Sequence, residues 1–198
     1  MMNFLFVNAC MRGEDSRTLR LCRDYIEKFK KAKAGESWSF AEVDLDAAGI
    51  EPLNRERLAH RDALARSKKW DDEEFALARQ IIAADHILIG APYWDLSFPS
   101  KLKVYLERCS VTGLTFIYSP EGIPHGQCRA QSLSYVTTAG SAIRDFNFGY
   151  EYVRGLCALF GIEKTFFASA EELDIIGKDV PAIMAAAEDK ITAIIGSL

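Results

Sequence analysis

Two aromatic residues and a carboxylate follow a short apolar run in the middle of the chain. The run ends at Gly90-Ala91-Pro92, and Tyr93, Trp94 and Asp95 come directly after it. Such a run, bounded by a turn, is typical of a strand that is buried on both faces of a sheet. Ligands of open parallel sheets bind outside the carboxyl ends of the strands. The two rings therefore predict a site for a flat ligand, with an ordinary packing role as the alternative.

A second group of candidate residues, Ser16, Arg17 and Thr18, stands where a helical pattern begins after the first apolar run. The free amides and the dipole at the start of a helix favour an anion. The hydroxyl groups of Ser16 and Thr18 and the guanidinium of Arg17 would complete a phosphate-binding site. The alternative is that Asp15 or Ser16 only caps the helix.

A third candidate loop, Thr138-Ala139-Gly140-Ser141, follows a later apolar run. Its side chains are small enough for a ligand to reach the backbone amides, although the same turn could be a plain connection. Taken together, the three loops describe a phosphate at the first loop and a planar ring between the other two. This combination predicts a site for flavin mononucleotide (FMN).

The elements that must position these loops alternate between strands and helices five times. Alternation of this kind predicts an α/β protein in which a doubly wound, five-stranded parallel sheet has helices on both faces. We expect strands over residues 3–8, 37–45, 85–91, 130–138 and 163–168. Residues 46–72 are less regular and basic, and we interpret them as a solvated surface excursion. No linker interrupts the chain, so we expect one domain over residues 1–198.

Composition limits the classes of protein to which the chain could belong. With 24 Lys and Arg against 28 Asp and Glu, the net charge is −4, which disfavours nucleic-acid binding. No apolar run is long enough for a signal peptide or a membrane span, so we expect a cytoplasmic protein that does not contact a membrane. Five scattered cysteines and three distant histidines indicate neither a disulfide framework nor a metal site. We interpret Cys22, Cys109 and Cys157 as small apolar core residues.

An extended arm follows the helix that Gly113 ends. Phe116, Ile117 and Tyr118 stand in a row there, before a loop over residues 119–126 that is rich in glycine and proline. Such a run is an apolar surface that a second copy of the chain can cover. We therefore expect a homodimer in which the arm of one chain closes the flavin site of the other. The alternative is that the arm folds back on its own sheet.

Three segments of the chain resemble one known family. Residues 90–103, GAPYWDLSFPSKLK, resemble the A-P-M-Y-N-F-x-I-P-x-x-L-K segment of the FMN-dependent NADH azoreductases, which belong to the flavodoxin-like NAD(P)H:quinone oxidoreductases. Residues 113–118, GLTFIY, resemble the G-x-T-F-x-Y arm of that family. Residues 136–141, VTTAGS, resemble its I-T-S-R-G-G turn. The resemblance extends over most of the chain and is weakest between about residues 44 and 72.

The resemblance implies a flavodoxin-like homodimer with two FMN sites at its interface. It implies hydride transfer from NAD(P)H and the passage of two electrons to quinones or azo compounds. The residues that it assigns to FMN are Cys10, Ser16, Arg17, Thr18, Pro92, Tyr93, Trp94, Asp95, Leu96, Thr138, Ala139, Gly140 and Ser141. The chain departs from the family at Ala139 and Ser141, which break the R-G-G pattern. Ile143 and Arg144 stand where the family has a histidine.

The mechanism that we expect is a ping-pong scheme, in which nicotinamide and acceptor use the same open face of the flavin in turn. Amides of Trp94 and Asp95 would bind the polar edge of the ring. No side chain is assigned as a catalytic acid or base. Tyr118 and Tyr150 are conceivable proton donors, and the alternative is that both side chains only pack against the rest of the protein.

Two other functions fit parts of the pattern. One is a phosphatase of the C-x5-R-[ST] kind using Cys10 and Arg17, although six residues separate the two where that motif has five. The acidic Glu14 and Asp15 between them would also repel a phosphate dianion. The other is a flavodoxin-like electron carrier without NAD(P)H turnover. The modest net charge and the arm favour an enzyme over a carrier.

Overall fold

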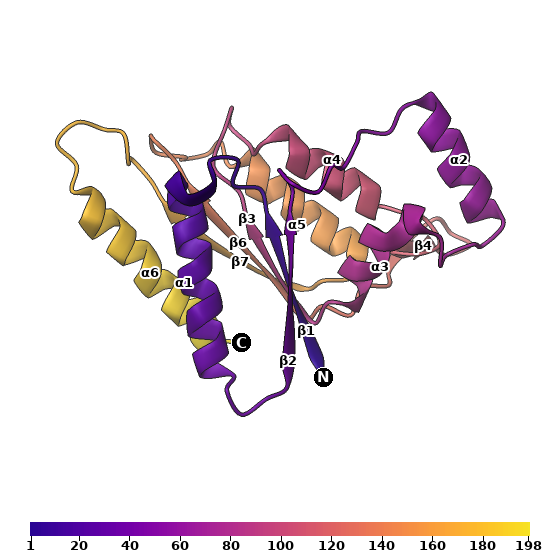
Figure 1. The fold of residues 1–198 in the computed structure, drawn as a ribbon, viewed down its shortest axis with the longest axis horizontal. Helices are drawn as coiled ribbons and strands as arrows, with labels where there is room; N and C mark the ends of the chain where they lie inside the picture. Colours follow the sequence, from indigo (N-terminus) through magenta and orange to yellow (C-terminus); the bar gives the residue numbers. More distant parts are fainter.

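Five parallel strands form the central sheet, in the order β2-β1-β3-β6-β7 (Figure 1). The structure is a computed structural model that describes residues 1–198. The strands are β1 (Met2–Asn8), β2 (Trp38–Asp44), β3 (His86–Gly90), β6 (Ser132–Thr138) and β7 (Lys164–Ala170). All four pairings between them are parallel. The strand order confirms the predicted flavodoxin-like, doubly wound sheet.

The order of the strands places a crevice beside β1. From β1 the chain passes to the edge strand β2 and then returns to the other side of β1 to form β3. Connections that leave in opposite directions open a crevice at the carboxyl ends of β1 and β3. Every residue of β3 is buried, as its continuous apolar run predicts.

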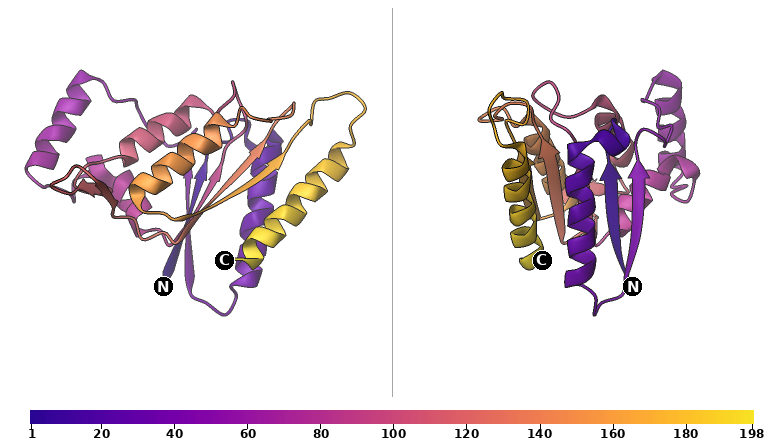
Figure 2. Two further views of the ribbon diagram at one scale, coloured as in Figure 1. Left: turned by 180° about the vertical axis from the view of Figure 1, so that it is seen from behind. Right: turned by 60° about the vertical axis from the view of Figure 1, so that its left-hand side comes forward.

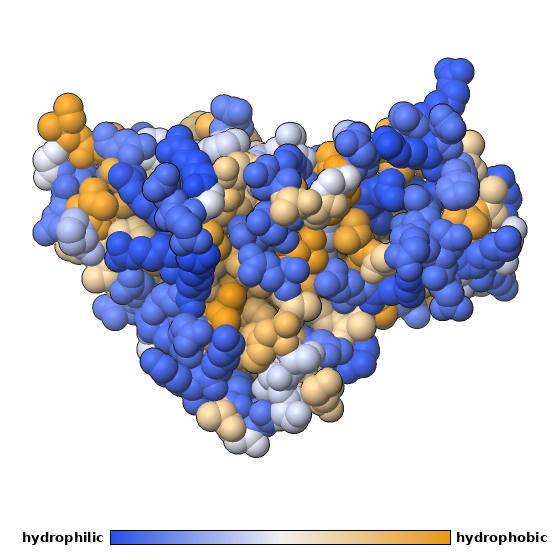
Figure 3. All heavy atoms as spheres, in the orientation of Figure 1, coloured by the Kyte–Doolittle hydropathy of each residue, from blue (hydrophilic) through white to orange (hydrophobic).

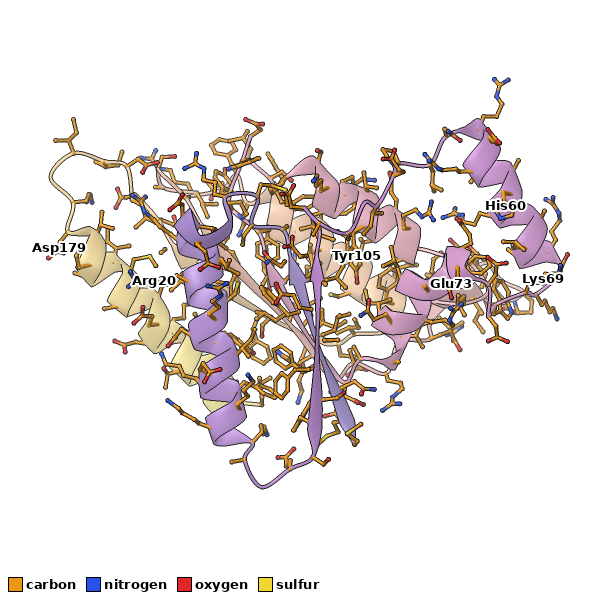
Figure 4. The ribbon with its side chains drawn as sticks, viewed as in Figure 1. Arg20, His60, Lys69, Glu73, Tyr105 and Asp179 are labelled. Atoms are coloured by element: carbon orange, nitrogen blue, oxygen red, sulfur yellow. The ribbon has the colours of Figure 1, made fainter.

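Helices cover both faces of the sheet (Figure 2). One face carries α1 (Arg17–Ala32) and α6 (Val180–Gly196), and the other carries α3 (Ala76–Ala83), α4 (Ser100–Cys109) and α5 (Phe148–Phe160). Each face has its own cluster of buried apolar side chains. Figure 4 shows Arg20 between α1 and α6, where it pairs with Glu188 at 3.4 Å, and Tyr105 on α4 in the opposite layer.

The basic stretch between β2 and β3 contains a helix that the sequence did not predict. This helix, α2 (Arg55–Arg66), begins at Asn54, whose side chain accepts a hydrogen bond from the Arg57 amide at 2.9 Å. Only one of its residues, Leu64, is buried, so the helix has almost no apolar periodicity. The short η2 (Glu73–Phe75) precedes α3. The end of the molecule over α2 is largely hydrophilic, and His60 and Lys69 lie there (Figures 3 and 4).

The arm after α4 forms a small antiparallel hairpin of β4 (Phe116–Tyr118) and β5 (Pro124–Gly126). Gly126 packs against the end of α5 so closely that a Cβ atom there would lie 1.9 Å from the carbonyl carbon of Phe160. The Phe116 side chain is 7% exposed and belongs to the core of its own chain. The alternative of an arm folded on its own chain therefore holds for Phe116, whereas Ile117 and Tyr118 remain exposed.

The cysteines are all free thiols, and Cys22, Cys109 and Cys157 are buried in the core as expected. No helix is both long enough and apolar enough to cross a membrane.

Candidate functional site

A cavity of about 380 Å³ lies at the carboxyl ends of β1, β3 and β6. Its walls come from the three loops that the sequence singled out, together with the segment that follows β7. The lining residues are Arg12, Asp15, Ser16, Arg17, Thr18, Pro92, Tyr93, Trp94, Thr138, Ala139, Gly140, Leu173 and Asp174. The convergence follows from the parallel sheet, because it brings the carboxyl ends of neighbouring strands to one edge.

The first wall is the start of α1, which the short helix η1 (Gly13–Asp15) precedes. The Ser16 hydroxyl accepts a hydrogen bond from the Leu19 amide at 3.2 Å, so Ser16 is the helix cap. The amides of Arg17 and Thr18 find no acceptor within the chain. Unpaired amides at the positive end of a helix dipole favour an anionic ligand. The structure therefore makes Ser16 the helix cap and leaves the amides of the next two residues free for the expected anion, which stays a prediction.

Arg17 is held by the segment after β7. Its guanidinium donates to the Asp174 carboxylate at 2.9 Å and to the Leu173 carbonyl at 3.4 Å. Sequence reasoning missed Leu173 and Asp174, as well as Arg12 and Asp15. Leu173 and Asp174 follow the fifth strand within an acidic stretch, Glu171-Glu172-Leu173-Asp174, which is not distinguishable in sequence from a solvated turn.

The aromatic turn forms the second wall. The Tyr93 amide donates to the Thr138 carbonyl at 3.0 Å, and the Tyr93 hydroxyl donates to the Phe146 carbonyl at 3.0 Å. Partial burial and the nearby Glu171 carboxylate raise the pKa of Tyr93, so its hydroxyl stays protonated at neutral pH. The Trp94 side chain is 39% exposed. These contacts fix the turn and leave an indole available at the wall of the cavity.

The backbone of this turn differs from the expectation in one respect. The Trp94 amide donates to the Ser97 carbonyl at 3.2 Å, so it is already used within the chain. The Asp95 amide has no acceptor within the chain. Asp95 and Leu96 adopt positive φ angles of 50° and 65°, and neither lines the cavity. Of the two amides expected to bind a ring, only that of Asp95 is therefore unpaired.

The small-residue turn forms the third wall. The Ala139 amide is paired with the Ala170 carbonyl at 2.9 Å, whereas the amides of Gly140 and Ser141 find no acceptor within the chain. A Cβ atom on Gly140 would lie 2.4 Å from a carboxylate oxygen of Asp174. The expected access to backbone amides therefore exists at Gly140, while the exposed Ser141 lies outside the cavity lining.

Cys10 lies away from the cavity. Its thiol is buried and lies 3.6 Å from the Gly90 carbonyl, to which it donates. Burial raises the pKa of the Cys10 thiol to about 11. Because the thiolate is the nucleophile, a buried thiol that stays protonated cannot act in a phosphatase. The structure therefore contradicts the phosphatase alternative and does not bring Cys10 to the predicted site.

The two conceivable proton donors also lie outside the lining of the cavity. The Tyr150 hydroxyl is 3.0 Å from that of Thr165, and its ring packs against Tyr135 and Phe167. Tyr118 lies on the hairpin, with its ring against Phe116. Tyr150 is therefore a packing residue, whereas Tyr118 is 55% exposed on the hairpin.

Comparison with known proteins places this geometry in a family. A sequence model described as "Flavodoxin-like fold" matches residues 2–195. The chain is 31% identical over 185 residues to the FMN-dependent NADH:quinone oxidoreductase of Coprothermobacter proteolyticus, and the match covers 91% of each protein. It is also 31% identical over 200 residues to FMN-dependent NADH:quinone oxidoreductase 1 of Pseudomonas syringae pv. tomato, covering 96% of each.

Solved structures show the same fold. An azoreductase from Bacillus anthracis str. Sterne superposes with a TM-score of 0.88 at 19% identity, and the match covers all of both chains. An FMN-dependent NADH-azoreductase from Bacillus anthracis str. Ames Ancestor, solved in complex with FMN, superposes with a TM-score of 0.86 at 16% identity, covering 100% of this chain and 99% of that one. The chain thus belongs to the flavodoxin-like family that includes the FMN-dependent NADH:quinone oxidoreductases.

Proposed function

We propose that this protein is an FMN-dependent oxidoreductase that takes hydride from NAD(P)H and passes two electrons to a quinone or an azo compound. The observation that carries this proposal is the pair of unpaired amides at Arg17 and Thr18, which open onto a cavity with an aromatic wall and a glycine wall. The names of the relatives at 31% identity support the same activity. An enzyme of this kind uses its protein part to bind and orient the flavin.

The residues of the cavity fit FMN. The start of α1 offers two amides, the Thr18 hydroxyl and the Arg17 guanidinium to a phosphate, which is the anion that such helix starts bind. The unpaired amide of Gly140 suits the polar edge of a ring, and the Trp94 indole suits its face. A volume of about 380 Å³ lies in the range of pockets that bind ligands of this size.

The protein contributes to the reaction by binding the cofactor and orienting it. Bound FMN supplies the hydride chemistry, accepting two electrons at its ring and passing them on. Thr18 and Arg17 would hold the phosphate at one end, while Trp94 and Gly140 would limit where the ring can lie. The three loops line one cavity, and we propose that nicotinamide and acceptor would enter it in turn, as a ping-pong scheme requires. No side chain of the cavity is assigned as a catalytic acid or base.

We also propose that the protein is a homodimer with residues 1–198 as one domain in each protomer. Two exposed apolar surfaces support the dimer. The first, on the hairpin, consists of Ile117, Tyr118 and Ile123, and the second, beside the aromatic turn, consists of Trp94, Leu96, Phe146, Phe148 and Tyr152. In a two-fold dimer the hairpin of one protomer can cover the aromatic surface of the other, and each surface is then used twice.

The proposal is tested with the purified protein and added FMN. We expect quenching of flavin fluorescence at micromolar FMN, loss of the visible flavin absorbance when NADH or NADPH is added without oxygen, and its return when a quinone is added. Absence of FMN binding would overturn the proposal. If the protein binds FMN but neither NADH nor NADPH reduces it, the result would instead indicate a flavodoxin-like electron carrier. The arm and the modest net charge of the chain do not support that alternative.

A further inference from the structure

We propose that Asp174 occupies the place on Arg17 that the FMN phosphate takes, so that cofactor binding exchanges one anion for another on the same guanidinium. The inference rests on the proposed function, because it concerns the phosphate end of the same cavity. It assigns Asp174 the role of a positioning residue that sets how strongly the site prefers a phosphorylated flavin.

The geometry of the pair is the first step of the argument. A guanidinium nitrogen of Arg17 lies 2.9 Å from one carboxylate oxygen of Asp174, and both side chains line the cavity. The other carboxylate oxygen lies over Gly140, where a Cβ atom would come within 2.4 Å of it. The carboxylate therefore lies between the helix start that suits a phosphate and the turn that suits a ring.

Hydrogen bonds fix the backbone that carries this carboxylate. The amide of Leu173 donates to the Ala139 carbonyl at 3.1 Å, and the amide of Asp174 donates to the Gly140 carbonyl at 3.1 Å. Before them, Glu172 has a φ of 64° and pairs with Lys178 at 2.7 Å. The segment after β7 is thus attached to the end of β6, and Asp174 faces Arg17 from a fixed backbone.

The charged residues that line the cavity show how the Arg17–Asp174 ion pair affects the binding of a phosphate. Two cations, Arg12 and Arg17, face two carboxylates, Asp15 and Asp174, so the formal charges of the lining sum to zero. Both contacts of Arg17 use the same guanidinium nitrogen, so a phosphate that binds end-on, through both terminal nitrogens, needs the nitrogen that Asp174 occupies. The two side chains are 47% and 71% exposed, so their attraction is weak. A phosphate, which can form two parallel hydrogen bonds with the guanidinium, displaces the carboxylate.

The exchange has a consequence that distinguishes ligands. Riboflavin has no phosphate and leaves the Arg17–Asp174 pair intact, whereas FMN whose phosphate binds Arg17 end-on breaks it. Removing the Asp174 charge should therefore tighten FMN and leave riboflavin unaffected. Because exposed ion pairs contribute little, the expected gain is about threefold to tenfold at low ionic strength.

The test measures dissociation constants for FMN and riboflavin by fluorescence quenching in the wild-type protein, D174N, R17Q and the double variant. We expect D174N to bind FMN about threefold to tenfold more tightly, with riboflavin unchanged within about twofold. In the R17Q background the same substitution should give no gain. The control is D189N, which removes an exposed carboxylate on α6 that pairs with neither Arg17 nor the segment after β7, and it should leave both constants unchanged.

The outcomes separate this inference from the proposed function. If the wild-type protein does not bind FMN, the proposed function fails and the inference falls with it. If the wild-type protein binds FMN but D174N binds it equally or more weakly, only the exchange is overturned. An equal gain in the R17Q background would show that Asp174 acts by repulsion through space, and an equal gain for riboflavin would show a general loosening of the cavity. Either result contradicts the exchange on Arg17.

Discussion

The hydroxyl oxygens of Thr18 and Thr138 lie 2.7 Å apart and join the first turn of α1 to the end of β6. Thr18 is fully buried, although its side chain borders the cavity. One hydrogen bond therefore fixes the distance between the wall that suits a phosphate and the wall that suits a ring. A site held in this way needs little rearrangement when its ligand binds.

Thr18→Ala is expected to weaken FMN binding about tenfold to a hundredfold. The substitution removes one hydrogen bond to a charged group, which contributes about 1.5–3 kcal/mol. Riboflavin should lose less affinity than FMN, because for riboflavin the substitution removes only the Thr18–Thr138 hydrogen bond between the two walls. Fluorescence titration with both ligands checks this, and Thr137→Val is the control because the buried Thr137 hydroxyl has no partner. Equal losses for FMN and riboflavin would place the phosphate elsewhere.

Cys10 is expected to resist alkylation in the folded protein. Burial raises its pKa to about 11, so at pH 8 about one thiol in a thousand is ionised. Mass spectrometry after iodoacetamide treatment should find Cys10 unmodified in the native protein and modified after unfolding. The protein should also fail to hydrolyse an aryl phosphate. Rapid modification of native Cys10 would contradict the buried position.

The stability of the protein is expected to fall as the pH is lowered below about 6.5. Burial lowers the pKa of His86 from 6.5 to about 3, so the unfolded chain takes up a proton that the folded chain does not. The free energy of unfolding should therefore decrease by up to about 1.4 kcal/mol per pH unit between these two values. Urea unfolding at several pH values measures the slope. One cooperative transition is expected if residues 1–198 form one domain.

The matched variant for this prediction is His86→Gln, which does not titrate. The His86 ring lies 3.0 Å from the Tyr25 hydroxyl and 2.8 Å from that of Ser132, and an amide can serve both as donor and acceptor. The pH slope of the variant should be shallower than that of the wild-type protein. Identical slopes would assign the pH dependence to other groups.

Tyr118→Asp is expected to weaken the homodimer and FMN binding together. Phe116, the more obvious position in sequence, is unsuitable because its side chain lies in the core and a charge there would unfold the chain. Tyr118 is 55% exposed, so the monomer should stay folded. Sedimentation and FMN titration give the two readouts, with Ile176→Asp as a control at a fully exposed apolar position. A folded monomer with full FMN affinity would refute a shared site.

The three loops could be predicted from sequence because each follows an apolar run, and parallel strands bring their carboxyl ends together. Which side of a loop faces a cavity does not follow from residue type. Cys10 follows β1 as expected but points into the core, where it is 4% exposed. The helix α2 was missed because Leu64 is its only buried residue. Asp174 was missed because it reaches Arg17 through a pairing between segments 157 residues apart.

The close approach of Gly140 to Asp174 makes the residue types allowed at positions 140 and 174 depend on each other. Any side chain there would meet the Asp174 carboxylate, because a Cβ atom would come within 2.4 Å of it. A larger residue can replace this glycine where the residue facing it is small, or where the Asp174 side chain turns away from position 140. Positions 140 and 174 should therefore covary among descendants of a common ancestor, and a library randomised at both should recover compatible pairs rather than independent residues.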